Sequence, residues 1–243
     1  MSKIAIVTGA SRGIGASIAK RLARDGMTVV VNYSNRVEEA AEVVAEIAAA
    51  AGKAIAVKAD VSSAKSVREM FDTVETQLGK VDVLVNNAGV MPALKPLAEH
   101  DDDTFDRVIA INLKGSFNTM REAATRLSNG GRIVNFSSSV TGLAFPGYTV
   151  YAATKSAIET MTNILAKEMR GRNITVNAVA PGPTGTDLFL TGKSPEAIEK
   201  LARAAPLERL GTPDDIAAAV AFLAGPDGSW INGQTLRANG GII

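Results

Sequence analysis

The sequence has 243 residues, of which 46% are hydrophobic and 21% are charged, and its formal net charge is +1. This balance gives no basic excess for binding nucleic acid through its phosphates, and no apolar run reaches the roughly 18 residues that a membrane span needs. The absence of cysteine excludes thiolate metal sites, and the single histidine, His100, argues against an imidazole zinc site. Because its start lacks a signal-peptide pattern, the chain is expected to be cytoplasmic.

Short β-branched runs alternate with helical patterns along most of the chain. The runs that predict strands lie at 3–8, 28–31, 54–58, 81–85, 132–136 and 174–179, with a last short strand after a turn near 232–234. Helical patterns follow Gly15 and also cover 38–51, 63–78, 104–127, 151–170 and 213–224. Repeated βα units of this kind form a parallel sheet with helices on both faces. We therefore expect one α/β domain over residues 1–243, a Rossmann-type doubly wound sheet.

A glycine-rich loop follows the first predicted strand. Residues 9–15 read Gly-Ala-Ser-Arg-Gly-Ile-Gly and lead into a helical pattern that contains Ile18 and Leu22. A strand, a glycine loop and a helix N-terminus together form the geometry that cradles a pyrophosphate. The spacing Gly-x3-Gly-x-Gly differs from the usual Gly-x-Gly-x-x-Gly, so a plain βα turn stays an alternative.

The same loop also fits the nucleophile elbow of serine hydrolases, Gly-x-Ser-x-Gly, with Ser11 at its centre. Such a serine needs a histidine base, and the sequence offers only His100. That histidine lies in the polar run 99–103, which is typical of a helix cap, and we interpret it as a surface residue. A hydrolase using Ser11 is kept as a rival hypothesis.

The end of the second predicted strand indicates which dinucleotide is bound. Domains that prefer NAD place an acidic residue about 20 residues after the glycines, where it binds the ribose 2′-hydroxyl. Residues 28–37 contain no Asp or Glu. Asn32 and Ser34, together with Arg12 and Arg36, can instead receive a 2′-phosphate. The pattern favours NADP(H).

Tyr151 and Lys155 are four residues apart on a predicted helix, so their side chains share one helix face. A nearby ammonium group favours the phenolate and makes a tyrosine a more useful acid or base. Carbonyl reduction needs a hydride donor, an acid and a group that orients the carbonyl. A nicotinamide, Tyr151 and Ser138 would supply these, although spacing alone does not choose among the three serines at 137–139.

The chain resembles the short-chain dehydrogenase/reductase family over essentially its whole length. The residues that carry this resemblance are Thr8-Gly9-x3-Gly13-x-Gly15, Asp60-Val61, Asn86-Asn87-Ala88-Gly89, Asn112, Ser138, Tyr151-x3-Lys155 and Pro181-Gly182 with Thr186. Each motif is weak by itself, and their combination is specific. Within the family, the chain is most similar to 3-oxoacyl-(acyl carrier protein) reductases and related carbonyl reductases.

The resemblance implies a role for each matching residue. Tyr151 would be the general acid or base, and Lys155 would lower its pKa while binding the nicotinamide ribose. Ser138 would hold the substrate carbonyl, and Asn112 would position a water molecule in a proton relay. The implied cofactor-binding residues, besides Tyr151 and Lys155, are Gly9, Ser11, Arg12, Gly13, Ile14, Gly15, Asn32, Tyr33, Ser34, Asp60, Val61, Asn87, Ala88, Gly89, Pro181, Gly182, Thr184 and Thr186.

The residues expected around the substrate are mostly apolar. They are Ser138, Val140, Phe145, Tyr148, Leu188 and Phe189, with Val90 and Met91 beside them. Because they carry no charge, they suit a ketone or an acyl chain better than an anionic metabolite. The loosely patterned segment 184–205 is the expected lid over this cleft.

Two kinds of partner are expected. An acidic acyl carrier protein would dock on a basic patch formed by Arg126, Arg132, Arg170 and Arg172. The family resemblance also implies a homotetramer, with the helix of Tyr151 and the C-terminal strand at interfaces.

The expected reaction is NADPH-dependent reduction of a 3-oxoacyl thioester or a related carbonyl. The alternatives are an NAD(P)-dependent sugar or polyol dehydrogenase and a non-catalytic dinucleotide-binding scaffold.

Overall fold

A computed structural model describes residues 2–243, so Met1, the first residue of the predicted domain, lies outside it. Within the described residues, seven parallel strands form one sheet in the order β3-β2-β1-β4-β5-β6-β7. Its strands are β1 (Ile4–Val7), β2 (Thr28–Tyr33), β3 (Lys53–Lys58), β4 (Val83–Asn86), β5 (Arg132–Phe136), β6 (Thr175–Pro181) and β7 (Thr235–Ala238). The chain order reverses between β1 and β4, and ligands bind such sheets at this switch point.

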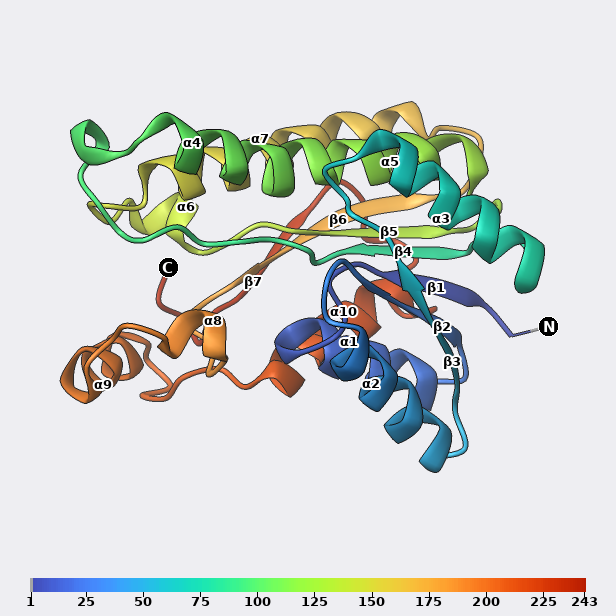
Figure 1. Cartoon of the computed structure of the whole chain (residues 1–243), viewed down its shortest axis with the longest axis horizontal. Coiled ribbons are helices and arrows are strands. Elements are labelled where there is room, and N and C mark those ends of the chain that lie inside the picture. Colours follow the sequence, from blue (N-terminus) through green and yellow to red (C-terminus); the bar gives the residue numbers. More distant parts are fainter. Residues whose placement is uncertain (1) are drawn as a thin grey trace.

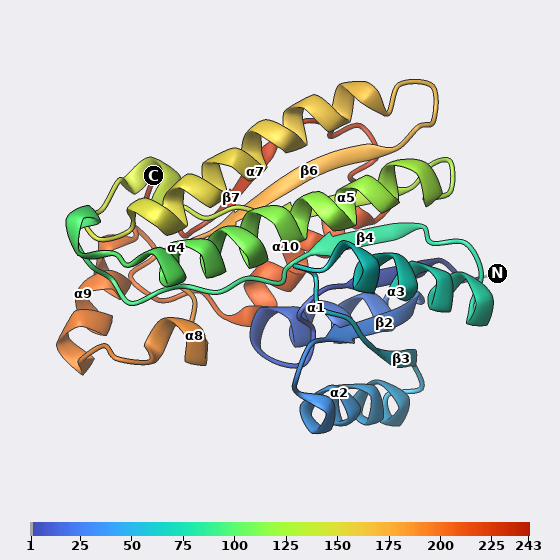
Figure 2. The same cartoon turned by 45° about the horizontal axis from the view of Figure 1, so that its top comes forward.

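Helices cover both faces of the sheet (Figures 1 and 2). One face carries α1 (Gly13–Arg24), α2 (Val37–Ala49) and α10 (Pro213–Ala224). The other carries α3 (Ala64–Gln77), α4 (Asp102–Val108), α5 (Gly115–Arg126) and α7 (Thr149–Glu168). The short helices α6 (Val140–Leu143), α8 (Asp187–Leu190) and α9 (Pro195–Ala204) lie at one end, on the left in Figure 1. A 3-10 turn covers Leu97–Glu99.

The apolar residues of the central strands and of the helices are buried on both faces of the sheet. All four residues of β1 and of β4 are buried, as expected of central strands covered on both faces. One apolar cluster, which includes Ile18 and Ile216, fills the space under α1 and α10, and a second, around Phe71, lies under α3 and α5. The predicted α/β fold class is confirmed. None of the described helices combines the length and apolarity needed to cross a bilayer.

The predicted helix over 104–127 differs from the observed one in its winding. The helix begins at Asp102 and includes a π-helical segment, Ile109–Lys114, between α4 and α5. A π-helical segment holds one more residue per turn than its α-helical neighbours, which rotates the side chains that follow. Such a change leaves no trace in a hydrophobic pattern that is read at α-helical spacing.

The predicted basic docking patch is wrong. Arg132 is 6% exposed and donates to the carbonyls of Gly130 and Gly131. Arg172 donates to backbone carbonyls of Ala124 and Leu127. Because Arg132 begins β5, these arginines lie at the amino end of the sheet, away from the strand ends where ligands bind. Only Arg170 of the predicted set remains an exposed side chain in the described part of the chain.

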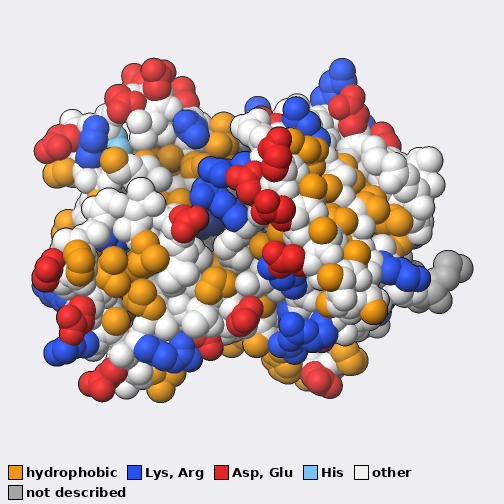
Figure 3. Space-filling view, turned by 60° about the horizontal axis from the view of Figure 1, so that its bottom comes forward, with side chains coloured by type: hydrophobic (Ala, Val, Ile, Leu, Met, Phe, Trp, Pro, Cys, Tyr) orange, Lys and Arg blue, Asp and Glu red, His pale blue; other side chains and the backbone are white. Residues whose placement is uncertain are grey.

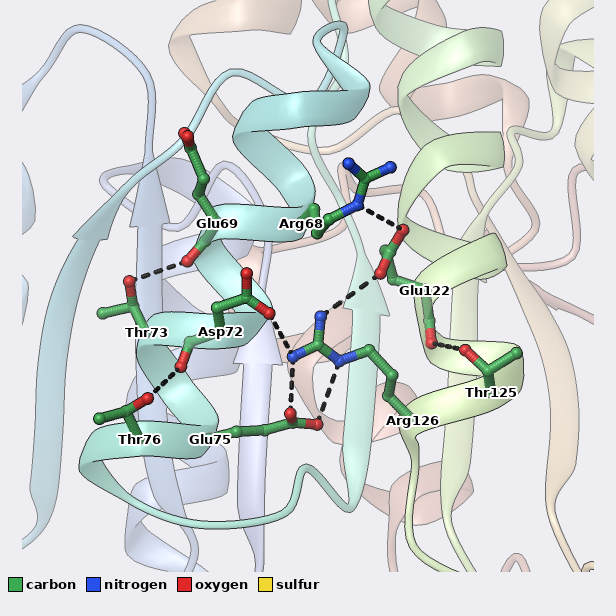
Figure 4. Close-up of polar contacts among 9 residues, drawn as sticks. All are labelled: Arg68, Glu69, Asp72, Thr73, Glu75, Thr76, Glu122, Thr125 and Arg126. Carbon is green, nitrogen blue, oxygen red and sulfur yellow. Dashed lines mark hydrogen bonds and ion pairs between the residues drawn. The ribbon is translucent and has the colours of Figure 1, made fainter.

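The remaining arginine, Arg126, joins α5 to α3 (Figure 4). Its guanidinium contacts Asp72 at 2.7 Å, Glu75 at 2.6 Å and Glu122 at 3.4 Å, and its side chain is 17% exposed. It also lies 5.4 Å from the centre of the Phe71 ring. The hydrogen bond that Arg126 donates to Glu75 is the largest of the contacts that raise the pKa of Arg126. The three carboxylates need this cation, because without it they repel one another.

Arg126→Ala is therefore expected to lower the free energy of unfolding by about 2 kcal/mol, measured by urea denaturation. Arg203 provides the matched control, because it pairs with Glu199 on α9 and its side chain is 74% exposed. Arg203→Ala should change stability by less than about 0.5 kcal/mol. Equal effects of the two substitutions would contradict the structural role of Arg126.

Candidate active site

Two clefts meet at the carboxyl ends of the strands. The polar cleft contains these predicted residues: Gly9, Ser11, Arg12, Gly13, Ile14, Gly15, Asn32, Tyr33, Ser34, Asp60, Val61, Asn87, Ala88, Gly89 and Thr186. The apolar cleft contains Ser138, Val140, Phe145, Tyr148, Tyr151, Lys155, Pro181, Gly182, Thr184, Leu188 and Phe189. Ile14, Asn87 and Gly89 line both clefts, so the two are continuous. The structure brings together every predicted site residue except Asn112, which is buried and lines neither cleft.

The glycine loop has the shape of an anion cradle. A Cβ atom added at Gly15 would lie 2.5 Å from the carbonyl oxygen of Gly9 and 2.6 Å from Nδ2 of Asn87. Gly9 has a φ of +62°, a conformation that suits glycine. At the N-terminus of α1, Arg12 makes no side-chain cap and the first turn has no acidic residue. The loop and this helix end therefore fit the pyrophosphate of a dinucleotide.

Asn32 has a different task from the predicted one. Its side chain is buried, accepts from the Gly9 N–H at 3.2 Å, and donates to the carbonyls of Val57 and Ala59. The amide therefore fixes the glycine loop to the ends of β2 and β3 and is not free to receive a phosphate. Exposed polar groups remain next to it at 34–36.

Two basic side chains border the polar cleft near these groups. Arg12 lies 3.7 Å from Asp187, and its side chain is 47% exposed. Arg36 is held by Glu39 at 2.6 Å. A third, Arg107 of α4, also lines this cleft, as does Ile111, and it was not predicted. Arg107 and Ile111 are four residues apart and share a helix face, but the sequence does not show which way that face points.

Figure 3 presents the face of the molecule that lies lowest in Figure 1. Lys and Arg side chains gather near its centre, with Asp and Glu side chains beside them. Hydrophobic side chains gather on both sides of these charged groups, over the left and the right parts of the face. Charged and apolar surfaces thus adjoin on this face, as they do where the two clefts meet.

Asn112 is fully buried in the π-helical segment and holds the wall of the polar cleft. Its side chain accepts from the N–H of Val90 at 2.8 Å and donates to the carbonyl of Val90 at 2.9 Å. Its own carbonyl accepts from Ser116 Oγ at 2.8 Å. Val90 thus uses one donor and one acceptor of the side-chain amide, and the expectation that Asn112 positions a water molecule stays a prediction.

The partners of the three serines distinguish Ser138 from its neighbours. Ser137 donates to the Glu159 carboxylate at 2.5 Å. Ser139 donates to the carbonyl of Ala180 at 3.2 Å and accepts from Asn239 Nδ2 at 3.1 Å. Both neighbours are at most 2% exposed, whereas Ser138 is partly exposed and its hydroxyl accepts only a long hydrogen bond from the described residues, from the Val140 N–H at 3.4 Å. Its exposure thus favours Ser138 among the three serines, and its role stays a prediction.

Tyr151 and Lys155 lie side by side on α7. Lys155 Nζ is 5.5 Å from the centre of the Tyr151 ring and donates to the carbonyl of Phe136 at 2.9 Å. Burial raises the pKa of Tyr151 to about 12, and the nearby Ser138 side chain opposes the rise. Burial also lowers the pKa of Lys155 to about 8. The surrounding protein thus raises the pKa of Tyr151, whereas the resemblance implied that Lys155 lowers it.

The profile of a family described as "Enoyl-(Acyl carrier protein) reductase" matches residues 9–243. A Picea abies protein named "Short-chain type dehydrogenase/reductase" is 46% identical over 99% of this chain and 92% of its own length. The chain belongs to the short-chain dehydrogenase/reductase family. It is accordingly an oxidoreductase.

Other members of the family are similar over nearly the whole chain. An Arabidopsis thaliana protein named "NADPH-dependent aldehyde reductase-like protein, chloroplastic" is 43% identical, covering 99% of this chain and 94% of its own. A Burkholderia cenocepacia short-chain dehydrogenase, crystallised with NADP, has a TM-score of 0.93 and 40% identity. It covers 99% of this chain and 97% of its own. The predicted family is therefore confirmed.

The hydrolase hypothesis finds no support in this short-chain dehydrogenase/reductase. Ser11 lines the polar cleft, but His100 lines neither cleft of the described chain. The prediction that His100 is a surface residue is also wrong in part. Both ring nitrogens are buried and have no hydrogen-bond partner among the described residues. Asp101, not His100, caps α4 by accepting from the Thr104 N–H at 2.7 Å.

The burial of Lys155 predicts a cost to stability in this short-chain dehydrogenase/reductase. Its pKa falls from 10.5 unfolded to about 8 folded, so between these pH values the unfolded chain binds the additional proton. Stability from this group therefore rises with pH through that window, and the full cost is present below pH 8.

Lys155→Met is expected to raise the free energy of unfolding at pH 7 by ~1–3 kcal/mol, after the lost hydrogen bond to Phe136 is allowed for. The gain over the original chain should shrink as pH rises from 8 to 10.5, as measured by urea denaturation. Lys167→Met, at an exposed position on the same helix, should stay within about 0.5 kcal/mol throughout. A Lys155→Met chain less stable at pH 7 would contradict this account.

Proposed function

We propose that the chain is an NADPH-dependent carbonyl reductase that converts an uncharged, apolar ketone or aldehyde to an alcohol, with Tyr151 as the general acid. The observation that carries this proposal is the composition of the apolar cleft. Among its described lining residues, Lys155 is the one charged side chain, and it lies with Ser138 and Tyr151 at the strand ends. The other walls are aliphatic, aromatic, glycine or small polar residues.

The roles of the chain's residues follow from their placement. Bound NADPH supplies the hydride that the reduction requires. Ser138 donates a hydrogen bond to the carbonyl oxygen and orients it toward Tyr151. Tyr151 then gives its phenolic proton to the oxygen as negative charge develops there.

The protonation states of the site support reduction at neutral pH. A pKa of about 12 keeps Tyr151 protonated, so the proton that reduction consumes is already in place. Lys155 has a pKa of about 8 and is a cation at neutral pH, where it stabilises the phenolate that forms when the proton leaves. Asn112 acts at a distance, by holding Val90 in the cofactor cleft. A proton relay through Asn112 stays a prediction.

The shape of the apolar cleft supports an aromatic or branched apolar substrate. The rings of Phe145 and Tyr148 lie 6.2 Å apart at an angle of 52°, and Phe189 adds a third ring. Such walls hold a flat apolar group by area and ring contacts. A 3-oxoacyl thioester also fits the absence of charge. The predicted basic patch does not support a carrier-protein partner, because Arg132 is buried and Arg126 is ion-paired.

The segment 184–205 is proposed as the lid of this cleft. Leu188 and Phe189 of α8 and Leu201 of α9 line the cleft, while Asp187 approaches Arg12 of the glycine loop. One segment therefore touches both clefts, which is the placement that a lid requires.

A homotetramer is also proposed. Ile164 on α7, Leu236 on β7 and Trp230 just before β7 are exposed, and large exposed apolar groups favour burial between subunits. The cytoplasmic location stays a prediction.

The cofactor assignment is tested by Arg12→Ala. If Arg12 binds the 2′-phosphate, its loss should weaken NADPH binding by about 10–100-fold, the value of a charge-assisted hydrogen bond. The dissociation constant of NADH, measured by fluorescence titration, should change less than about threefold. Arg36→Ala is the matched control and should have a smaller effect, because Glu39 already pairs with Arg36. Equal losses for NADPH and NADH would refute the assignment.

The reaction is tested with a substrate panel. With NADPH, kcat/KM for benzaldehyde and 1-tetralone should exceed kcat/KM for acetoacetyl-CoA by at least about tenfold. Oxidation of glucose with NADP⁺ or NAD⁺ should be slower than the reduction of any of these three compounds. Tyr151→Phe should lower the reduction rate by about 100-fold or more. Faster glucose oxidation would favour the sugar dehydrogenase alternative. Cofactor binding without turnover of any carbonyl would favour the scaffold.

A further inference from the structure

The proposed reaction does not use Glu159, although the carboxylate of this residue lies close to Ser138. It lies on α7 eight residues after Tyr151 and four after Lys155, so the three side chains follow one another along the same helix face. Glu159 is partly buried and lines neither cleft. It therefore does not touch a substrate or a cofactor bound in those clefts.

The contacts of Glu159 enclose Ser138 on both sides. Oε1 of Glu159 accepts from Ser137 Oγ at 2.5 Å and from Thr141 Oγ1 at 3.1 Å. The single hydroxyl hydrogen of Thr141 is shared with the carbonyl oxygen of Ser138, which lies 2.9 Å from Oγ1. One oxygen of the Glu159 carboxylate thus binds both Ser137 and Thr141, which lie on either side of Ser138 in the sequence.

No other described contact holds Ser137 and Thr141 to α7 as closely. Ser137 Oγ lies 3.5 Å from the carbonyl of Lys155, a long distance for a hydrogen bond. Ser139 is fixed from the opposite side, by Asn239 and Ala180. The turn that carries Ser138 is therefore held between α7 on one side and the ends of β6 and β7 on the other.

We infer that Glu159 is a positioning residue, which fixes the Ser138 hydroxyl against Tyr151 by holding Ser137 and Thr141. The inference rests on the role proposed for Ser138. A misplacement of about 1 Å in a catalytic group costs up to about 100-fold in rate. Hydrogen bonds to a carboxylate are short and directional, and they restrict this turn more than neutral contacts do.

The test compares Glu159→Ala with Glu159→Gln, using the carbonyl compound that the chain reduces best in the panel. Glu159→Ala removes the acceptor and should lower kcat at least about tenfold while KM changes less than about threefold. Glu159→Gln keeps an oxygen acceptor and should retain kcat within about threefold. Glu168→Ala, at an exposed position of the same helix, should leave kcat unchanged.

A double-mutant cycle shows whether Glu159 acts through Ser138. If it does, Ser138→Ala combined with Glu159→Ala should be within about twofold of Ser138→Ala alone. Independent, multiplicative losses would overturn the inference, and so would a Glu159→Ala chain with normal kcat. A Glu159→Gln chain as slow as Glu159→Ala would also overturn it, because charge rather than placement would then matter.

Two further measurements separate this inference from simpler explanations. A fall in melting temperature and in NADPH affinity parallel to the fall in kcat would identify Glu159 as merely structural. If Glu159→Ala does not fold, Ser137→Ala replaces it, with the same expected kcat loss and the same non-additivity with Ser138→Ala. Normal activity of Ser138→Ala would remove the proposed role of Ser138 itself. Impaired Ser138→Ala beside normal Glu159→Ala would refute only the role of Glu159.

Discussion

The hydrogen bond from Lys155 Nζ to the carbonyl of Phe136 fixes the relation between α7 and β5 on which the site depends. Phe136 is the last residue of β5, and Ser138 follows two positions later. Lys155 therefore sets the height of α7 beside the strand end, and Tyr151, one turn earlier, comes to the level of Ser138. The bond is made by a buried ammonium group, which costs folding free energy. The protein thus trades stability for the alignment of two side chains on different elements.

A buried polar chain under the site supports this alignment. Asn86 donates to Asn135 at 2.8 Å, and Asn135 donates to Thr162 of α7 at 2.9 Å. Thr119 of α5 donates to Asn86 at 2.5 Å. Each of these four side chains has a hydrogen-bond partner. The network therefore links β4, β5, α5 and α7 without leaving a buried polar side chain unpaired. Its directional bonds restrict sliding of α7 along β5, which apolar contacts alone would resist less.

The sequence predicted the helices and strands well where one residue pattern has one physical cause. The strand at 132–136 and the helix at 213–224 appear as predicted. The errors concern polar side chains whose partners come from distant parts of the chain. Asn32 turns toward β3, and Arg126 meets carboxylates from α3. No local pattern shows such pairings, because they depend on how the helices and strands pack.

The residues proposed for the reaction and the residues expected around the substrate lie on different elements. This difference explains why the reaction is easier to predict than the substrate. Ser138, Tyr151 and Lys155 are set by the ends of buried strands and by α7, where packing leaves few alternatives. Leu188, Phe189 and Leu201 come from α8 and α9, and α9 has no buried residue. Segments with little buried surface open at low cost in free energy and tolerate substitution. The substrate cleft therefore combines a rigid reactive wall with a wall that can adapt, and substrate preference is expected to follow the second.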